Sequence, residues 1–299
     1  IPAFSDDKYA RSVVGLVAGS DTYPGAGVLA TRGALAAGVG MVRLNSTRRV
    51  QDLVLADQPG VVMVGGRIQS ALIGPGLDED RREDALELAQ FCGLAGTPLV
   101  IDAWALNLVP ELGDVMNPEV TVLTPHYGEA SRLLGLLGAP VTRAEVAAAP
   151  LRYARALHEA TGCHVVLKGP VTIVYSYEYV DLSAEGGVDV HPELTRVYEP
   201  TVNATTTSWA GVAGSGDVLA GLIAGVLARP LAPRPGLAGP DGRPQYVTSA
   251  RISAAVMLHA RAADRIGRQY AGDIAMQASD IAREIPRTAA VRGSSRVRY

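Results

Sequence analysis

The chain has 299 residues, of which 48% are hydrophobic and only 5% aromatic. A core of this composition consists of small aliphatic side chains packed closely, which is typical of α/β proteins, and a chain of this length can bury such a core in one domain. The formal net charge of -3 gives no excess of basic residues that would bind nucleic acid, and no apolar run reaches the length of a membrane span. We therefore expect neither nucleic acid nor a membrane as a partner.

Short β-branched runs alternate with longer amphipathic runs along the first half of the chain. Strands are expected at 12–19, 41–44, 70–76, 98–103 and 120–125, and helices at 25–38, 80–94 and 142–161. The helix at 142–161 carries Arg, Glu and His on the face expected to meet water, and "HVVLKGPVTIVYS" predicts a strand, a tight turn and a second strand. Apolar strands separated by helices predict a mostly parallel sheet that is covered on both faces.

The C-terminal half contains two helical patterns. Apolar residues return with helical spacing after "AGSGD", which predicts a helix that begins near Gly216 or Asp217, and a second helix is expected over 249–266. The proline- and glycine-rich residues 230–244 between them predict an irregular insertion. Residues 287–299 carry four arginines and no hydrophobic period. We therefore expect one domain over 1–286 and a flexible tail over 287–299.

Glycine-rich or polar loops follow most of the expected strands. They read "GSDTYPGAG" (19–27), "GPGLD" (74–78), "DAWALN" (102–107), "TPHYGE" (124–129) and "KGPVT" (168–172). In parallel sheets, ligands bind outside the carboxyl ends of the strands, so these loops and the helix start at "GSGD" are expected to gather at one edge. The free N–H groups of a helix start after glycines favour phosphate. Asp217 at this place is either a helix cap or a catalyst.

The ordered set of these motifs resembles the ADP- or ATP-dependent NAD(P)H-hydrate dehydratases of the ribokinase-like superfamily. The resemblance continues through "AAVMLHARAAD" and "ASDIAREIP", so it covers nearly the whole chain. It implies a three-layer αβα sandwich with a mostly parallel central sheet. The implied activity is metabolite repair, in which hydrated NADH and NADPH (NADHX and NADPHX) are dehydrated at the expense of ADP or ATP, with Mg²⁺ bound to the nucleotide.

The resemblance also implies roles for single residues. Asp217 would be the catalytic residue at the hydrated nicotinamide ring, and Ala26, Gly76 and His126 would line the substrate pocket with it. The nucleotide would be held by Gly216 and by the "KGPVT" loop, which comprises Lys168, Gly169, Pro170, Val171 and Thr172.

Several positions depart from the family pattern. Trp104 replaces the second Asp of "DADALN", Tyr127 replaces a common Pro after "TPH", and "TSWAGV" stands where "NPGLAT" is usual. Many bacterial members also carry an N-terminal epimerase domain. We therefore expect an NAD(P)HX epimerase as a separate partner or as a fused domain outside this sequence.

The residues themselves leave alternatives open. Lys168 alone would be a solvated charge, but in a convergent loop it favours ligand binding. His126 alone would be structural, but between a strand and a helix at the active edge it favours a hydrogen bond to substrate. Glu129 is interpreted as an early-helix acid. Trp104 is interpreted as a packing residue, with stacking on a base or nicotinamide as the alternative, and Asn107 either binds substrate or caps a turn.

Two other functions compete with the dehydratase. The first is a small-molecule kinase of the same fold, acting on a hydroxymethylpyrimidine or a sugar alcohol. The second is a catalytically silent nucleotide-binding protein, against which the presence of Asp217 argues. Cys92 and Cys163 form no metal or redox motif, and the first dozen residues lack an apolar signal segment. We expect a cytoplasmic homo-oligomer without a transition-metal site.

Overall fold

The computed structural model describes residues 11–181, 194–198, 200–204, 210–229, 249–269 and 276–294. Eight strands form the central sheet: β1 (Val13–Val17), β2 (Met41–Asn45), β3 (Ser70–Ile73), β4 (Leu99–Ile101), β5 (Thr121–Leu123), β6 (His164–Leu167), β7 (Val171–Tyr175) and β10 (Thr201–Ala204). Their order is β10-β7-β6-β5-β4-β3-β1-β2, and β1 to β6 are parallel while β7 and β10 pair antiparallel. This confirms the predicted mostly parallel sheet. Strands β8 (Tyr177–Asp181) and β9 (Leu194–Tyr198) pair separately.

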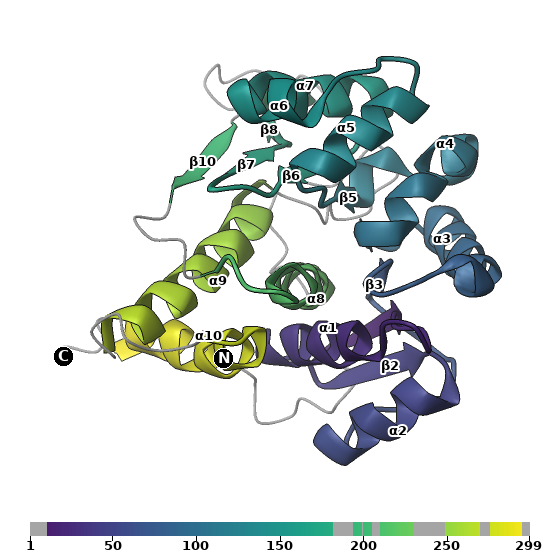
Figure 1. Cartoon of the computed structure of the whole chain (residues 1–299), viewed down its shortest axis with the longest axis vertical. Helices are drawn as coiled ribbons and strands as arrows, with labels where there is room; N and C mark the ends of the chain where they lie inside the picture. The colour runs from purple at the N-terminus through teal and green to yellow at the C-terminus, as the bar shows by residue number, and fades with distance from the viewer. Residues whose placement is uncertain are drawn as a thin grey trace, which may run out of the picture.

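Helices cover both faces of the sheet (Figure 1). One layer contains α1 (Pro24–Ala36), α2 (Arg48–Asp57), α8 (Ser215–Ala228), α9 (Ser249–Gln269) and α10 (Ala278–Ser294). The other contains α3 (Arg82–Ala95), α4 (Val109–Leu112), α5 (Tyr127–Leu136), α6 (Arg143–Ala148) and α7 (Pro150–Thr161). The 3₁₀ turns are η1 (Glu79–Arg81), η2 (Ala103–Leu108), η3 (Gly113–Val115) and η4 (Pro118–Val120). Two helical layers around one sheet confirm the three-layer αβα sandwich.

Close backbone packing fixes the position of α8. A Cβ atom on Gly221 would lie 2.1 Å from the carbonyl oxygen of Ala30, and one on Gly33 would lie 2.2 Å from that of Val218. Only glycine at these positions lets the backbones of α1 and α8 approach so closely. The Ser70 hydroxyl donates to the carbonyl of Ala224 at 2.6 Å and ties α8 to β3. Figure 1 shows α8 at the centre of the molecule, between α1 and α9.

The helix expected over 142–161 was predicted wrongly. It is two helices, α6 and α7, which meet at Ala149 and Pro150. Pro150 has no N–H to donate to the preceding turn and is instead favoured at the first position of a new helix. His158 was expected on the face that meets water, but it is buried, and its Nδ1 lies 2.6 Å from the carbonyl oxygen of Cys163.

The C-terminal end of the described chain is also more regular than expected. Helix α10 runs to Ser294, through the predicted boundary at residue 287. Alanine and arginine after this boundary are good helix formers, and α10, which contains Pro286, packs on α9 and α1. The insertion expected at 230–244 lies outside the described residues. Among the described helices, none is both long and apolar enough to cross a membrane.

Candidate active site

Helix α8 presents its first turn at the carboxyl edge of the sheet. Its N-cap is Gly214, which has a φ of 82° and makes no side-chain cap hydrogen bond. This left-handed conformation is one that glycine adopts without strain. Asp217 lies within the first turn and does not occupy the cap. Asp217 is therefore not the cap of α8.

Lys168 directly follows β6 and points toward two carboxylates. Its Nζ lies 2.5 Å from Oδ1 of Asp102 and 4.0 Å from Oε2 of Glu129. The Asp102 side chain is only 1% exposed and also accepts a hydrogen bond of 2.7 Å from the Thr124 hydroxyl. Burial by itself lowers the pKa of Lys168, but the charge of Asp102, followed by that of Glu129, outweighs burial and raises it. Lys168 is therefore a firmly charged ammonium in a mostly buried place.

Asp217 has a pKa close to neutral pH. Its pKa is raised from 3.8 to about 7, chiefly by burial and then by the negative charge of Asp102. Lys168 opposes this shift, and Glu129 adds to it. A carboxyl with a pKa near 7 can both accept and release a proton at working pH, which suits it to general-base catalysis. Perturbed groups of this kind cluster at functional sites.

His126 is the N-cap of α5 and faces the same edge. Its Nδ1 accepts hydrogen bonds from the N–H groups of Gly128 and Glu129, at 3.0 and 3.1 Å, while the Glu129 carboxylate accepts from the N–H of His126. This reciprocal capping box confirms Glu129 as an early-helix acid. Because Nδ1 is used as an acceptor, Nε2 carries the proton when the ring is neutral. The His126 side chain is 59% exposed, so it is accessible to a ligand.

The "KGPVT" loop forms one wall of a cavity of about 650 Å³. Its lining residues include His126, Lys168, Gly169, Pro170, Thr172, Asn203, Ser215, Gly216 and His259. Val171 begins β7 beside them. Gly169 packs closely against the ring of Tyr127. A Cβ atom on Gly169 would lie 2.3 Å from the phenol oxygen. The structure thus brings the predicted nucleotide loop, Gly216 and His126 to one cavity.

Ala26 and Gly76 also lie together, although neither is among the residues that line that cavity. Gly76 has a φ of 64°, and a Cβ atom there would come within 2.5 Å of the Ala26 Cβ and 2.7 Å of the Tyr23 carbonyl oxygen. These contacts join the loop after β1 to the loop after β3. Both the conformation and the space therefore require glycine at 76.

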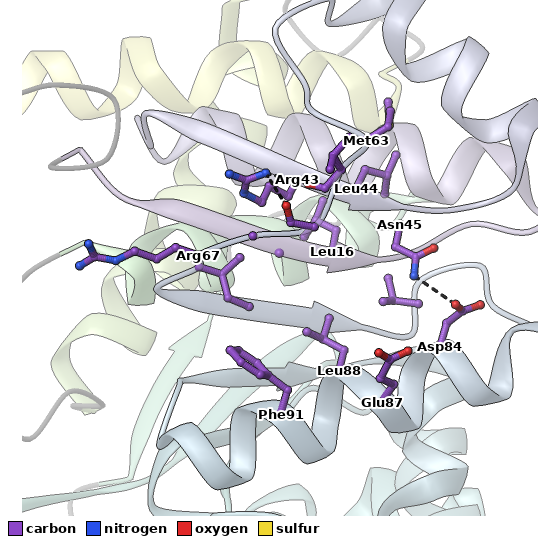
Figure 2. Close-up of a pocket in the computed structure, with 16 residues that line it drawn as sticks. Leu16, Arg43, Leu44, Asn45, Met63, Arg67, Asp84, Glu87, Leu88 and Phe91 are labelled. Atoms are coloured by element: carbon purple, nitrogen blue, oxygen red, sulfur yellow. Dashed lines mark hydrogen bonds between the residues drawn. The ribbon is translucent and has the colours of Figure 1, made fainter.

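A second cavity, of about 780 Å³, lies between β1, β2 and α3. Figure 2 shows Arg43, Asn45, Glu87 and Phe91 around it, with Asn45 donating a hydrogen bond to Asp84. None of the predicted site residues lines this cavity. Although it is larger, we assign the candidate active site to the cavity at α8, where the titratable groups and the phosphate-favouring helix start converge.

Sequence reasoning missed Asp102, the partnership of Glu129 with Lys168, and His259. Asp102 directly follows a buried strand, which is the signal that could have identified it. His259, from α9, has its Nε2 3.1 Å from both the hydroxyl and the carbonyl oxygen of Ser215. Burial lowers the pKa of His259 to about 4, so it supports the start of α8 as a neutral ring.

Solved structures share this architecture. An ADP/ATP-dependent NAD(P)H-hydrate dehydratase from Bacillus subtilis, co-crystallised with ATP and Mg²⁺, is 21% identical, with a TM-score of 0.72 over 97% of this chain and 93% of its own. A ribokinase from Cryptococcus neoformans in complex with ADP is 12% identical, with a TM-score of 0.52 over 95% of this chain and 99% of its own. The fold is therefore that of the ribokinase-like α/β proteins.

The sequence matches the NAD(P)H-hydrate dehydratase family over residues 14–189 and 195–287, and the chain belongs to that family. It is 38% identical to a bifunctional NAD(P)H-hydrate repair enzyme of Mycobacterium tuberculosis over 235 residues, which are 76% of this chain and 43% of that relative. It is 32% identical to an ADP-dependent (S)-NAD(P)H-hydrate dehydratase of Xanthomonas campestris over 249 residues, which are 77% of this chain and 76% of that one. The chain thus spans less than half the length of the bifunctional relative.

Proposed function

We propose that this protein dehydrates the hydrated forms of NADH and NADPH back to the normal cofactors, with ADP or ATP as co-substrate. The observation that carries this proposal is the buried carboxyl of Asp217, with a pKa of about 7, beside Lys168 and the start of α8. Membership of the NAD(P)H-hydrate dehydratase family and the activity of the Xanthomonas relative support the same reaction.

The chemistry explains why a dehydratase would use a kinase-like fold. The hydroxyl of the hydrated nicotinamide ring is a poor leaving group, and transfer of a phosphoryl group from the nucleotide converts it into a phosphate ester. Asp217 takes the hydroxyl proton as the oxygen attacks phosphorus, a role usually worth about 10²- to 10⁴-fold. The nucleotide leaves with one phosphate fewer. Loss of a ring proton and of phosphate then restores the double bond.

The nucleotide is assigned to the cavity of about 650 Å³. The "KGPVT" loop would hold it, the N–H groups that begin α8 would face the moving phosphoryl group, and Lys168 would supply positive charge. Among the described residues, no group of three or more His, Cys, Asp or Glu side chains could hold a metal ion. Mg²⁺ would therefore enter bound to the nucleotide phosphates, where it would offset part of their negative charge.

The hydrated dinucleotide is assigned to the side of Asp217 on which the loop after β1 meets the loop after β3. The contact between Ala26 and Gly76 supports a shared wall there. His126, which lines the cavity assigned to the nucleotide, would offer its Nε2 to the substrate as a hydrogen-bond donor. We further propose that the chain works with an epimerase, since a relative is a bifunctional NAD(P)H-hydrate repair enzyme. We also propose that it is a cytoplasmic homo-oligomer. Light scattering tests the oligomer.

The test is to incubate the purified chain with NADHX or NADPHX and either ADP or ATP, in Mg²⁺, and to follow NAD(P)H absorbance. We expect absorbance to rise only when the nucleotide is present, and inorganic phosphate to be released in equal amount. No gain in absorbance, together with phosphorylation of a pyrimidine or sugar alcohol, would favour the kinase. Binding of ADP without any turnover would favour the silent nucleotide-binding protein.

A further inference from the structure

Asp102 is held in place by the backbone around it. Its N–H donates to the carbonyl of Ile73 at 3.0 Å, and its own carbonyl oxygen lies 1.8 Å from where a Cβ atom on Gly74 would be. The next residue, Ala103, has a φ of 49°, a conformation that residues other than glycine rarely adopt. Strained backbone of this kind is found where the surrounding structure determines a functional geometry.

The side chain of Asp102 links two neighbouring strands. Its Oδ1 accepts from Thr124, which follows β5, and from Lys168, which follows β6. The carboxylate therefore reaches across the carboxyl edge of the sheet and holds the ammonium by a charge-assisted hydrogen bond of 2.5 Å.

The ammonium of Lys168 is thereby placed at the start of α8. Its Nζ lies 3.3 Å from the position of a Cβ atom on Gly216, the residue before Asp217. A lysine side chain has four rotatable bonds, so its charge is positioned only where a partner holds it. Glu129, at 4.0 Å, is a weaker partner because it also caps α5.

We propose that Asp102 is a positioning residue of this enzyme, which holds the Lys168 ammonium against the first turn of α8. Its negative charge is also, after burial, a cause of the raised pKa of Asp217. The inference rests on the proposed function, since it assigns Lys168 to the nucleotide and Asp217 to the proton. Among the described residues, the groups that face Asp217 or the start of α8 are Asp102 after β4, Lys168 after β6, Glu129 on α5 and the neutral His259 on α9.

A purely structural ion pair would behave differently. Its loss would lower stability without changing the pH at which the enzyme loses activity. The Arg32–Asp57 pair between α1 and α2 is such a pair, with Nη2 of Arg32 2.5 Å from Oδ1 of Asp57. Asp57→Asn is therefore the matched control for Asp102→Asn, because each exchange neutralises the carboxylate partner of a cation.

The kinetic test measures kcat and KM against pH. In Asp102→Asn we expect the acidic limb of the kcat/KM profile to move down by about one pH unit, since a neighbouring charge shifts a carboxyl by this order. In Asp57→Asn the limb stays in place. We expect Thr124→Val to lower kcat more than it changes KM, and Thr124→Ser, which keeps the hydroxyl donor, to restore kcat. An unmoved limb in Asp102→Asn, or equal losses in the two Thr124 variants, would overturn the proposal.

A second measurement needs no substrate and separates failure of this proposal from failure of the proposed function. Urea unfolding of Asp102→Asn, Asp217→Asn and the double variant gives the coupling between the two carboxyls. We expect this coupling at about pH 8, where Asp217 is ionised, to be at least about threefold larger than at about pH 5, where Asp217 is protonated. Coupling that does not depend on pH would overturn the inference even if the parent dehydrates NADHX. Loss of the dehydratase reaction alone, with this coupling intact, would overturn only the proposed function.

Discussion

Replacing Asp217 with Asn is expected to stabilise the folded chain at alkaline pH while removing its activity. Asp217 has a pKa of about 7 when folded, raised by burial and then by Asp102, against an ordinary value of 3.8. Between these two values the folded state keeps a proton that the unfolded state releases, so stability falls as the pH rises. Above about pH 7 the folded chain carries the full cost of a buried, ionised carboxylate. Asparagine carries no such cost.

The size of the effect follows from the two pKa values. They differ by about three units, and each unit corresponds to about 1.4 kcal/mol. Relative to the parent, Asp217→Asn should therefore gain at most about 4 kcal/mol of unfolding free energy between about pH 4 and pH 8. Most of this gain should appear between about pH 4 and pH 7, while the parent carboxyl still holds its proton in the folded state only.

Urea unfolding of parent and variant across this pH range measures the gain. Asp57→Asn is the control of opposite sign, because the hydrogen bond from Arg32 lowers the pKa of Asp57 and its ionised form stabilises the fold. That variant should be less stable than the parent at about pH 8, and the difference should shrink as the pH falls through the lowered pKa. A stability difference between Asp217→Asn and the parent that is the same at about pH 4 and pH 8 would refute the assignment of a raised pKa to Asp217.

Four further outcomes are expected. Asp217→Asn should abolish NADH formation while calorimetry still detects ADP binding, and activity within about tenfold of the parent would remove the residue from the base role. Gly169→Ala should displace the Tyr127 ring, which a Cβ atom would meet at 2.3 Å, and so weaken ADP binding. Adding Tyr127→Ala should restore ADP binding. A double variant that binds ADP as weakly as Gly169→Ala would contradict this steric explanation. NADH should raise the melting temperature, because binding at a hundredfold excess over Kd stabilises the folded state by about 2.7 kcal/mol. His126→Ala should reduce this shift. An undiminished shift would exclude His126 from the substrate pocket. Gly33→Ala should cost about 3 kcal/mol in urea unfolding, because its Cβ would lie 2.2 Å from a main-chain oxygen of α8, and a neutral result would mean that α1 and α8 pack less closely.

Much of this architecture was predictable from the sequence because its signals are local. β-Branched runs of four to eight residues and apolar residues at helical spacing identified the strands from β1 to β7 and the helices α1, α3, α8 and α9. The carboxyl-end rule then placed "KGPVT", "TPHYGE" and "GSGD" at one edge without any knowledge of contacts. Where a local signal was overlooked, as at Pro150, one expected helix became two.

The chemical state of the site was decided only by the tertiary structure. Asp102 and Lys168 are 66 residues apart and meet because β4, β5 and β6 are adjacent in the sheet. The raised pKa of Asp217 depends on its burial at the start of α8 and on charges that arrive from three other elements. A sequence pattern specifies which side chains lie at an edge, but a pKa depends on distances and on excluded water. The distances and the exclusion of water that set the pKa of Asp217 are fixed only when α8 packs against α1 and the sheet.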